Sequence, residues 1–185
     1  MSAHRRVAIG LGRTFQNLAL LRGESVLVNL LAGCHARMRS DPLSALFALP
    51  RARRAEAAAR EAAESLIAWL DLARMRDTAV GSLPYGVQKR VELGRALAMR
   101  PRLLLLDEMV SGMNTEETAA IARLVLRINQ ALGITVLMIE HDMGIVMDIS
   151  ERVTVLNFGT PIAEGTPAEV AADPAVIAAY LGAAA

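Results

Sequence analysis

The chain has 185 residues, enough for one domain with a hydrophobic core and too few for two domains of ordinary size. Hydrophobic residues make up 54% of it and charged residues 21%, which excludes an intrinsically disordered or collagen-like chain. The net charge of +1 hides an uneven distribution, because residues 1–100 carry 16 basic and 8 acidic side chains whereas residues 101–185 carry 4 and 11.

Several classes of protein are excluded by simple counts. Stretches without a charged side chain reach 12 residues, as in 25–36, well short of the roughly 20 that a membrane-spanning helix needs. Cys34 is the only cysteine, which excludes an internal disulfide and a cysteine metal cluster and fits a reducing, cytoplasmic compartment. The basic residues are scattered and aromatic residues amount to 3%, which argues against a nucleic-acid partner bound by stacking.

The first hundred residues are predicted to be mainly helical. Alanine, arginine and glutamate dominate 51–76, which follows Pro50, and opposite charges recur there at i,i+4 spacing. A second helix is predicted over 89–100, preceded by the turn-like segment 83–88.

A strand, a helix and a second strand are predicted after residue 101. The segment 103–106 is an apolar run and 135–139 is rich in residues that favour strands, as expected of strands buried on both faces of a parallel sheet. Between them, 115–132 has apolar residues at helical spacing, begins after Asn114 with a glutamate three residues on, and ends at Gly133. This order implies a crossover in an α/β layer.

The last third is predicted to add a strand and two short helices. The segment 153–157 and its return 161–164 are typical of a strand pair at the edge of the sheet. Thr166, followed by proline, begins one short helix, and Asp173, also followed by proline, begins the last.

An acidic pair follows the first predicted strand after residue 101. Asp107 and Glu108 would lie at its carboxyl end, where α/β sheets bind ligands, and there one carboxylate can hold Mg²⁺ while the other orients a water. The alternative is that the pair only starts a loop or caps a helix, and the residues alone leave the two interpretations even. His141 follows the second strand at the same edge, where an imidazole can reach a phosphate.

A third candidate site is the start of the helix predicted over 89–100. Gly86 lies just ahead of it, and a glycine at a helix start lets backbone N–H groups approach an anion. About twenty residues separate this segment from Asp107.

Five segments in chain order resemble motifs of ABC-transporter ATPase subunits. They correspond to the Q-loop, the signature motif, the Walker B strand with its glutamate, the D-loop and the switch histidine: 13–17, 83–86, 103–108, 111–114 and 140–141. Within that family, 159–170 and 173–182 resemble the subunits of branched-chain (hydrophobic) amino-acid importers, and the resemblance runs from about His4 to Gly182.

The resemblance implies an α/β, P-loop NTPase-like ABC ATPase fold with a helical subdomain. Residues 1–100 would hold the Q-loop and the helical subdomain with the signature motif. Residues 101–185 would form the RecA-like α/β part with Walker B, the D-loop, the switch histidine and the C-terminal helices.

The resemblance also assigns roles around ATP and Mg²⁺. Gln16 would contact Mg²⁺ or water and couple to the membrane subunits. Asp107 would hold Mg²⁺, Glu108 would be the general base, and His141 would sense the γ-phosphate. ATP held by a partner subunit would be bound by Leu83, Tyr85 and Gly86, together with Asn114.

The sequence departs from the family pattern in three places. Pro84 and Val87 stand where the common signature has serine and glutamine, and Met109 replaces the proline that usually follows the glutamate. No Gly-x-x-x-x-Gly-Lys-[Ser/Thr] segment occurs, because the only lysine is Lys89 in the signature helix. We therefore expect the fold to lack its first strands and P-loop, about 60 to 80 residues by ordinary element lengths.

These observations predict a fragment of the ATPase subunit of a branched-chain amino-acid ABC importer. Its expected partners are a second ATPase subunit, in a homo- or heterodimer, and permease subunits that hold it on the inner face of the cell membrane. One alternative is a non-catalytic module that pairs with a complete ATPase subunit. The other is an ABC ATPase outside transport, against which the importer-like tail and the absence of coiled-coil heptads count.

Overall fold

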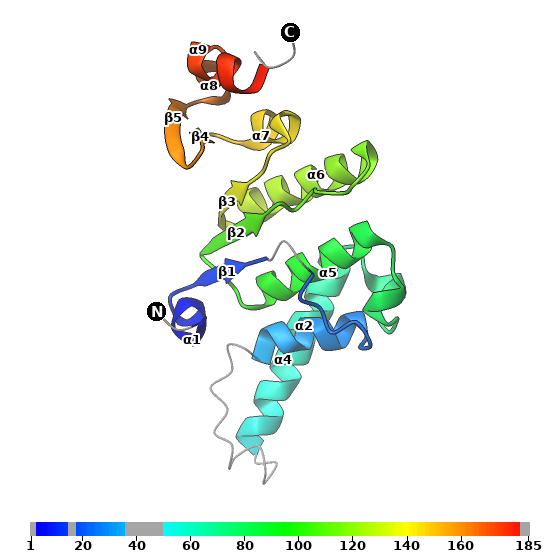
Figure 1. Cartoon of the computed structure of the whole chain (residues 1–185). Coiled ribbons are helices and arrows are strands. Elements are labelled where there is room, and N and C mark those ends of the chain that lie inside the picture. The colour runs from blue at the N-terminus through cyan, green and yellow to red at the C-terminus, as the bar shows by residue number, and fades with distance from the viewer. Residues whose placement is uncertain (1–2, 15–17, 36–49, 182–185) are drawn as a thin grey trace.

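The computed structural model describes residues 3–14, 18–35 and 50–181 (Figure 1). The strands are β1 (Leu11–Arg13), β2 (Leu103–Asp107), β3 (Thr135–Ile139), β4 (Val153–Asn157) and β5 (Thr160–Gly165). The helices are α1 (Ala3–Ala8), α2 (Val26–His35), α4 (Pro50–Trp69), α5 (Tyr85–Ala98), α6 (Thr115–Leu132), α7 (Met143–Ile149), α8 (Pro167–Ala171) and α9 (Pro174–Val176). Within these ranges no helix is long and apolar enough to span a bilayer.

A parallel three-stranded sheet in the order β1-β2-β3 forms the centre of the molecule. The predicted strand, helix and second strand are confirmed: α6 and β3 have the predicted bounds, and β2 runs one residue further, to Asp107. Strand β1 was not predicted, since the first hundred residues were expected to be mainly helical. It pairs with β2 in the register Gly12 to Leu104, which joins segments some ninety residues apart.

The two faces of this sheet have different surroundings. The covered face (Leu104, Leu106, Val136 and Met138) packs into the main hydrophobic core with residues of α5 and α6. On the open face (Leu105, Asp107, Leu137 and Ile139), Leu137 is 56% exposed and Ile139 is 64% exposed. The expectation that β3 is buried on both faces is therefore wrong, because no described residue covers its outer side chains.

Helix α6 is fixed at both ends by local hydrogen bonds. The Oδ1 of Asn114 accepts from the backbone N–H of Glu117 at 2.9 Å, and Glu117 Oε2 accepts from the N–H of Asn114 at 3.2 Å. At the other end Gly133 has a φ of 62°, the left-handed conformation that glycine adopts without strain. Both predicted caps are confirmed.

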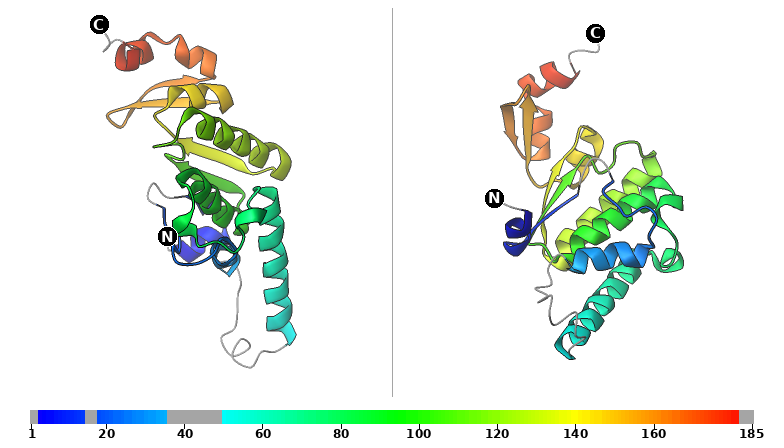
Figure 2. Two further views of the ribbon diagram at one scale, coloured as in Figure 1. Left: turned by 90° about the vertical axis from the view of Figure 1, so that its right-hand side faces the viewer. Right: turned by 60° about the horizontal axis from the view of Figure 1, so that its bottom comes forward.

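Helices α2, α4 and α5 form a layer beside the sheet (Figure 2). Helix α4 ends at Trp69, not at residue 76 as predicted, because Asp71 takes a positive φ of 57° and turns the chain. Glycines allow α2 and α5 to approach closely. A Cβ on Gly33 of α2 would collide with the backbone oxygen of Arg95, and one on Gly94 of α5 would lie 3.4 Å from Cδ1 of Leu30 in α2.

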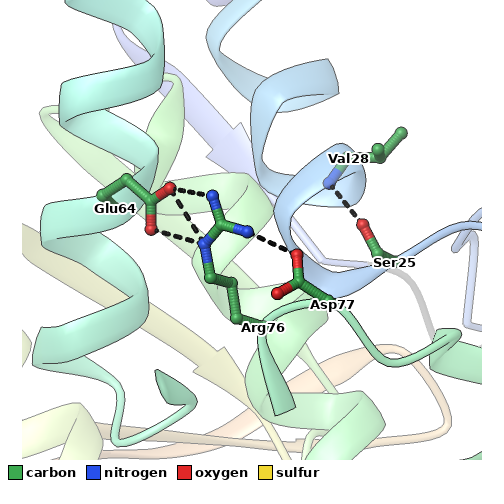
Figure 3. Close-up of polar contacts among 5 residues, drawn as sticks. All are labelled: Ser25, Val28, Glu64, Arg76 and Asp77. Carbon is green, nitrogen blue, oxygen red and sulfur yellow. Dashed lines mark hydrogen bonds and ion pairs between the residues drawn. The ribbon is translucent and has the colours of Figure 1, made fainter. Parts of the chain in front are cut away.

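The turn after α4 returns Arg76 to that helix (Figure 3). The Arg76 Nε donates to both carboxylate oxygens of Glu64 at 3.0 Å, and a second guanidinium nitrogen pairs with Asp77. The hydrogen bonds from Arg76 hold the pKa of Glu64 below its ordinary value.

The start of α2 is fixed by a local hydrogen bond, in which Ser25 Oγ accepts from the N–H of Val28 at 3.3 Å.

The C-terminal part forms a second, smaller unit at the other end of the molecule from α4 (Figure 2). Strands β4 and β5 pair with each other antiparallel and make a sheet of their own, so their predicted place at the edge of the main sheet is wrong. Thr166 caps α8 by bonds with Glu169, and Asp173 caps α9, as predicted. A small apolar cluster joins this unit together: Val153, Val155, Val170 and Val176.

Candidate functional site

The carboxyl ends of β2 and β3 lie side by side, because Asp107 is the register partner of Ile139. The residues that follow these two strands, Glu108 and His141, are therefore at the same edge of the sheet, as the sequence predicted. The N–H of Glu108 donates to the carbonyl of Ile139 at 2.9 Å, which ties the two strand ends together. The side chain of His141 is exposed at this edge.

Asp107 is held by residues at the end of β1. Its Oδ2 accepts a hydrogen bond from Arg13 Nη2 at 2.8 Å, in an ion pair that crosses from β1 to β2. The backbone N–H of Asp107 also donates to the Oγ1 of the buried Thr14 at 3.4 Å. Neither partner was expected, although both lie in the segment 13–17 that resembles the Q-loop, because nothing local in the sequence indicates that β1 adjoins β2.

The backbone of Glu108 is in an unusual conformation. Its φ is 46°, in the left-handed region that residues with a side chain rarely adopt. Such a conformation costs on the order of 1–3 kcal/mol and is found mostly where a site needs a particular side-chain placement. The hydrogen bond to Ile139 holds Glu108 in this conformation.

Glu140 is a further acidic residue at this edge, and no role was predicted for it. Its Oε1 accepts from the N–H of Val110 at 3.1 Å, so it holds the loop that follows the acidic pair. Burial raises the pKa of Glu140, against the lowering effect of hydrogen bonds from the Val110 and Met109 N–H groups. The sequence feature that could have indicated a role for Glu140 is its position immediately before His141.

The signature segment forms the first turn of α5. Helix α5 begins at Tyr85, with Pro84 as its N-cap residue, four residues earlier than predicted, so Gly86 lies within the first turn. Leu83 is buried, and its carbonyl accepts from Gln88 Nε2 at 2.7 Å. Of Leu83 and Tyr85, only Tyr85 has a largely accessible side chain, with an exposed fraction of 41%.

Gly86 and Asn114 come together where the first turns of α5 and α6 meet. A Cβ on Gly86 would lie 2.8 Å from Glu117 Oε1, so the glycine admits the carboxylate of the α6 capping box. Oδ1 of Asn114 caps α6, and its amide nitrogen can donate to a ligand. Gln16, assigned to the Q-loop, lies outside the described residues.

The donor set at the sheet edge fits Mg²⁺ in the way this ion is usually bound. Mg²⁺ takes one or two protein carboxylates together with phosphates and waters, and Asp107 offers one carboxylate at the strand end. Among the described residues no group of three or more acidic, histidine or cysteine side chains forms a complete cage. Arg13 already bonds one carboxylate oxygen of Asp107 and would therefore compete with the ion for this side chain.

Comparisons with families of known proteins agree with this geometry. Residues 2–111 match the family model described as ABC transporter. Residues 160–185 match the model described as branched-chain amino acid ATP-binding cassette transporter.

Individual relatives and solved structures cover most of the chain. It is 40% identical to the high-affinity branched-chain amino acid transport ATP-binding protein BraF of Pseudomonas aeruginosa, over 98% of this chain and 71% of BraF. The LivG protein of Escherichia coli, with the same description, is 38% identical over 94% of this chain and 68% of LivG. The crystal structure of the ATP-binding cassette MJ1267 in its ADP conformation has a TM-score of 0.80 at 32% identity, covering 98% of this chain and 72% of MJ1267.

Proposed function

The chain belongs to the ABC transporter ATPase family, and on that premise we propose that it provides ATP binding and hydrolysis for a branched-chain amino-acid importer. The relatives BraF and LivG, named for that transport, support the substrate class. The match of residues 160–185 to the branched-chain family model supports it independently, because this segment lies outside the match to the general ABC model.

The sheet edge is the proposed place of hydrolysis. When bound, ATP would supply the phosphoanhydride bond that is cleaved, and Mg²⁺ would neutralise part of the charge on the phosphates. Glu108 would orient the attacking water and accept its proton, Asp107 would hold the ion, and His141 would contact the terminal phosphate. The observation that carries this proposal is the register of Asp107 with Ile139, which brings the three residues to one edge.

The first turn of α5 is the proposed second half of an ATP site in a head-to-tail dimer. Tyr85 and Gly86 would face ATP bound to a partner subunit, with backbone N–H groups and the helix dipole as the attraction. Pro84 and Val87 add no polar side chain to it, so the backbone contact carries more of the binding here.

Docking on permease subunits would place the chain at the inner face of the cell membrane, with Gln16 at the coupling segment. A Gln16→Ala variant should then reduce transport more than assembly. Loss of the assembled complex would point to a structural role instead.

The test of hydrolysis uses a completed subunit, in which the P-loop segment of a relative such as BraF is fused ahead of His4. Glu108→Gln keeps the shape and hydrogen bonding of the side chain but removes the base. It should retain ATP and lose turnover by more than about a hundredfold, as expected for a missing general base. Equal specific activity of the completed subunit and its Glu108→Gln variant would rule out this role.

Two further variants separate the three roles. Asp107→Asn should weaken Mg²⁺-ATP binding, while His141→Ala should lower turnover with binding largely kept. If Asp107 and Glu108 only end a strand, both substitutions will change the midpoint of thermal unfolding and leave turnover per folded molecule unchanged.

A second candidate function is that of a non-catalytic partner of a complete ATPase subunit. The 185 residues contain no P-loop motif, and their only lysine is buried in α5. A titration of the 185-residue chain with a fluorescent ATP analogue and Mg²⁺ should give no saturable binding in the micromolar range, because no lysine-bearing loop is available to the phosphates. Saturable binding would contradict this expectation and remove the reason for the second candidate.

A further inference from the structure

The only lysine of the chain lies inside the molecule. The side chains of Lys89 and Glu92 are 0% and 2% exposed, and Lys89 Nζ is 3.9 Å from Glu92 Oε2. In the described part of the chain, no atom accepts a hydrogen bond from Nζ. A buried ammonium without hydrogen bonds opposes folding. A charge kept in the interior against this cost is a candidate for a role in function.

Lys89 lies against the aromatic ring of the signature segment. Tyr85, Lys89 and Glu92 follow each other at i,i+4 and i,i+3 spacing and therefore share one side of α5. The Nζ of Lys89 is 5.7 Å from the centroid of the Tyr85 ring, within the range of a cation–π contact. The same ring lies beside the turn at Gly112, where an added Cβ would be 3.9 Å from Cε1 of Tyr85. Lys89 thus supports a ring that bridges the signature segment and the turn before α6.

The carboxylate of Glu92 interacts electrostatically with two cations, Lys89 and Arg95. Three residues beyond Glu92, the half-buried Arg95 donates from Nη1 to the carbonyl of Ala19, in the segment that follows Gln16. Burial lowers the pKa of Arg95, and the charge of Glu92 counteracts this. Lys89, Glu92 and Arg95 together carry a net positive charge, so Glu92 does not fully neutralise Lys89.

The order of Lys89 and Glu92 along α5 adds to the helix dipole. The positive member is nearer the amino terminus and the negative member nearer the carboxyl terminus, which is the direction of the macrodipole itself. The pair therefore raises the positive potential at the first turn. Pro84 and Val87 bring no hydroxyl or amide to that turn.

We propose that Lys89 is a positioning residue of the signature segment. It holds the ring of Tyr85 in place and, with Glu92, strengthens the positive end of α5, so that the first turn receives the terminal phosphate of ATP held by a partner subunit. This inference rests on the proposed function, because it needs a dimer in which α5 faces the ATP of the partner.

The placement of Lys89 can be tested in the 185-residue chain itself. Labelling with [¹⁵Nζ]lysine should give one ammonium resonance that exchanges slowly with water, since the chain has a single lysine and it is buried. Tyr85→Leu should shift that resonance by removing the ring, whereas Tyr180→Leu, at the other tyrosine, should leave it in place. A resonance that exchanges as fast as free lysine, or that ignores Tyr85→Leu, would overturn the proposal.

The effect on ATP is measured as ATP-dependent dimerisation of the completed subunit carrying Glu108→Gln, which should retain ATP. Lys89→Met combined with Glu92→Gln removes both charges of the buried pair, so neither member is left without the other. Arg95 loses the charge of Glu92 in this variant but keeps its hydrogen bond to the carbonyl of Ala19. This double variant should weaken dimerisation about tenfold, the scale of a charge acting at a partly buried helix end. Lys89→Arg keeps the charge and should restore dimerisation to within about twofold.

The outcomes separate the two proposals. If the Glu108→Gln subunit does not dimerise with ATP at all, the proposed function fails and this inference fails with it. If it dimerises and the double variant dimerises equally well, with a change only in its thermal unfolding, the proposed function stands and Lys89 has no positioning role. ATP affinity of the separated subunits should be the same in all variants, because Lys89 acts on the ATP of the partner.

Discussion

Alternate residues of the same strands form the two faces of the central sheet, yet the side chains of the two faces differ greatly in burial. Leu104 on the covered face is fully buried in the main core, while Leu137 on the open face, on the neighbouring strand, is 56% exposed. The candidate site, with Asp107, belongs to the open face and its carboxyl edge. The alternation of side chains along the strands thus separates the residues that pack this sheet into the core from the residues of the candidate site.

Truncation of one leucine on each face tests this comparison most strongly. Leu104→Ala should lower the free energy of unfolding by about 2–5 kcal/mol, because it leaves a cavity in the core. Leu137→Ala, the matched control, should change it by about 0.5 kcal/mol or less. Chemical denaturation measures both, and equal losses would mean that the open face is buried in solution.

A smaller effect is expected from the helix layer. Gly33→Ala should cost about 1–3 kcal/mol of unfolding free energy, because the added methyl group meets the backbone of Arg95 and must separate α2 from α5. Gly23→Ala is the control, since nothing lies within 4 Å of its Cβ position. Thermal unfolding of the two variants should therefore differ clearly, and equal midpoints would contradict the tight contact of α2 with α5.

Glu140 should make the free energy of unfolding depend on pH. Because burial raises its pKa in the folded chain, protonated Glu140 favours folding at low pH, and this contribution is lost as the pH rises through the raised pKa. Glu140→Gln lacks this titration but keeps an acceptor for the Val110 N–H. The unfolding free energy of the unsubstituted chain, minus that of the variant, should fall from acid to neutral pH in denaturation series, and parallel curves would contradict this.

The smallest change in stability is expected for Arg13→Ala. The ion pair with Asp107 is partly exposed, so its loss should cost less than about 1 kcal/mol. Removal of the guanidinium should nevertheless free Asp107, and Mn²⁺ should bind more tightly to the completed subunit with ATP, as measured by electron paramagnetic resonance. Unchanged or weaker Mn²⁺ binding would mean that Arg13 does not compete with the metal.

Much of the fold could be predicted where local signals determine it. The bounds of α6 follow from Asn114 and Gly133, because caps act within one turn of a helix. The end of α4 could not be predicted, since Asp71 takes a positive φ without being a glycine. Strand β1 has three residues and is defined by a partner ninety residues away, which no local pattern indicates.

Some features of the candidate site could likewise be predicted from the sequence, and others could not. That Asp107 and His141 lie at one edge could be predicted, because each follows an apolar strand and the crossover makes those strands parallel. The bond of Arg13 to Asp107 and that of Glu140 to Val110 could not, because they depend on which strands and loops become neighbours. The start of α5 was placed too late because Pro84 acts as its N-cap, a position where no side-chain bond marks the boundary.

Because the single lysine is buried, cleavage after it can measure the local unfolding of α5. An endoprotease that cleaves only after lysine has one target bond here, between Lys89 and Arg90, in the middle of α5. Cleavage requires this helix to unwind, so under conditions where reclosing is fast its rate measures the free energy of that opening. A nucleotide or a partner subunit that engages the first turn of α5 should therefore slow the appearance of two fragments, without any label on the protein.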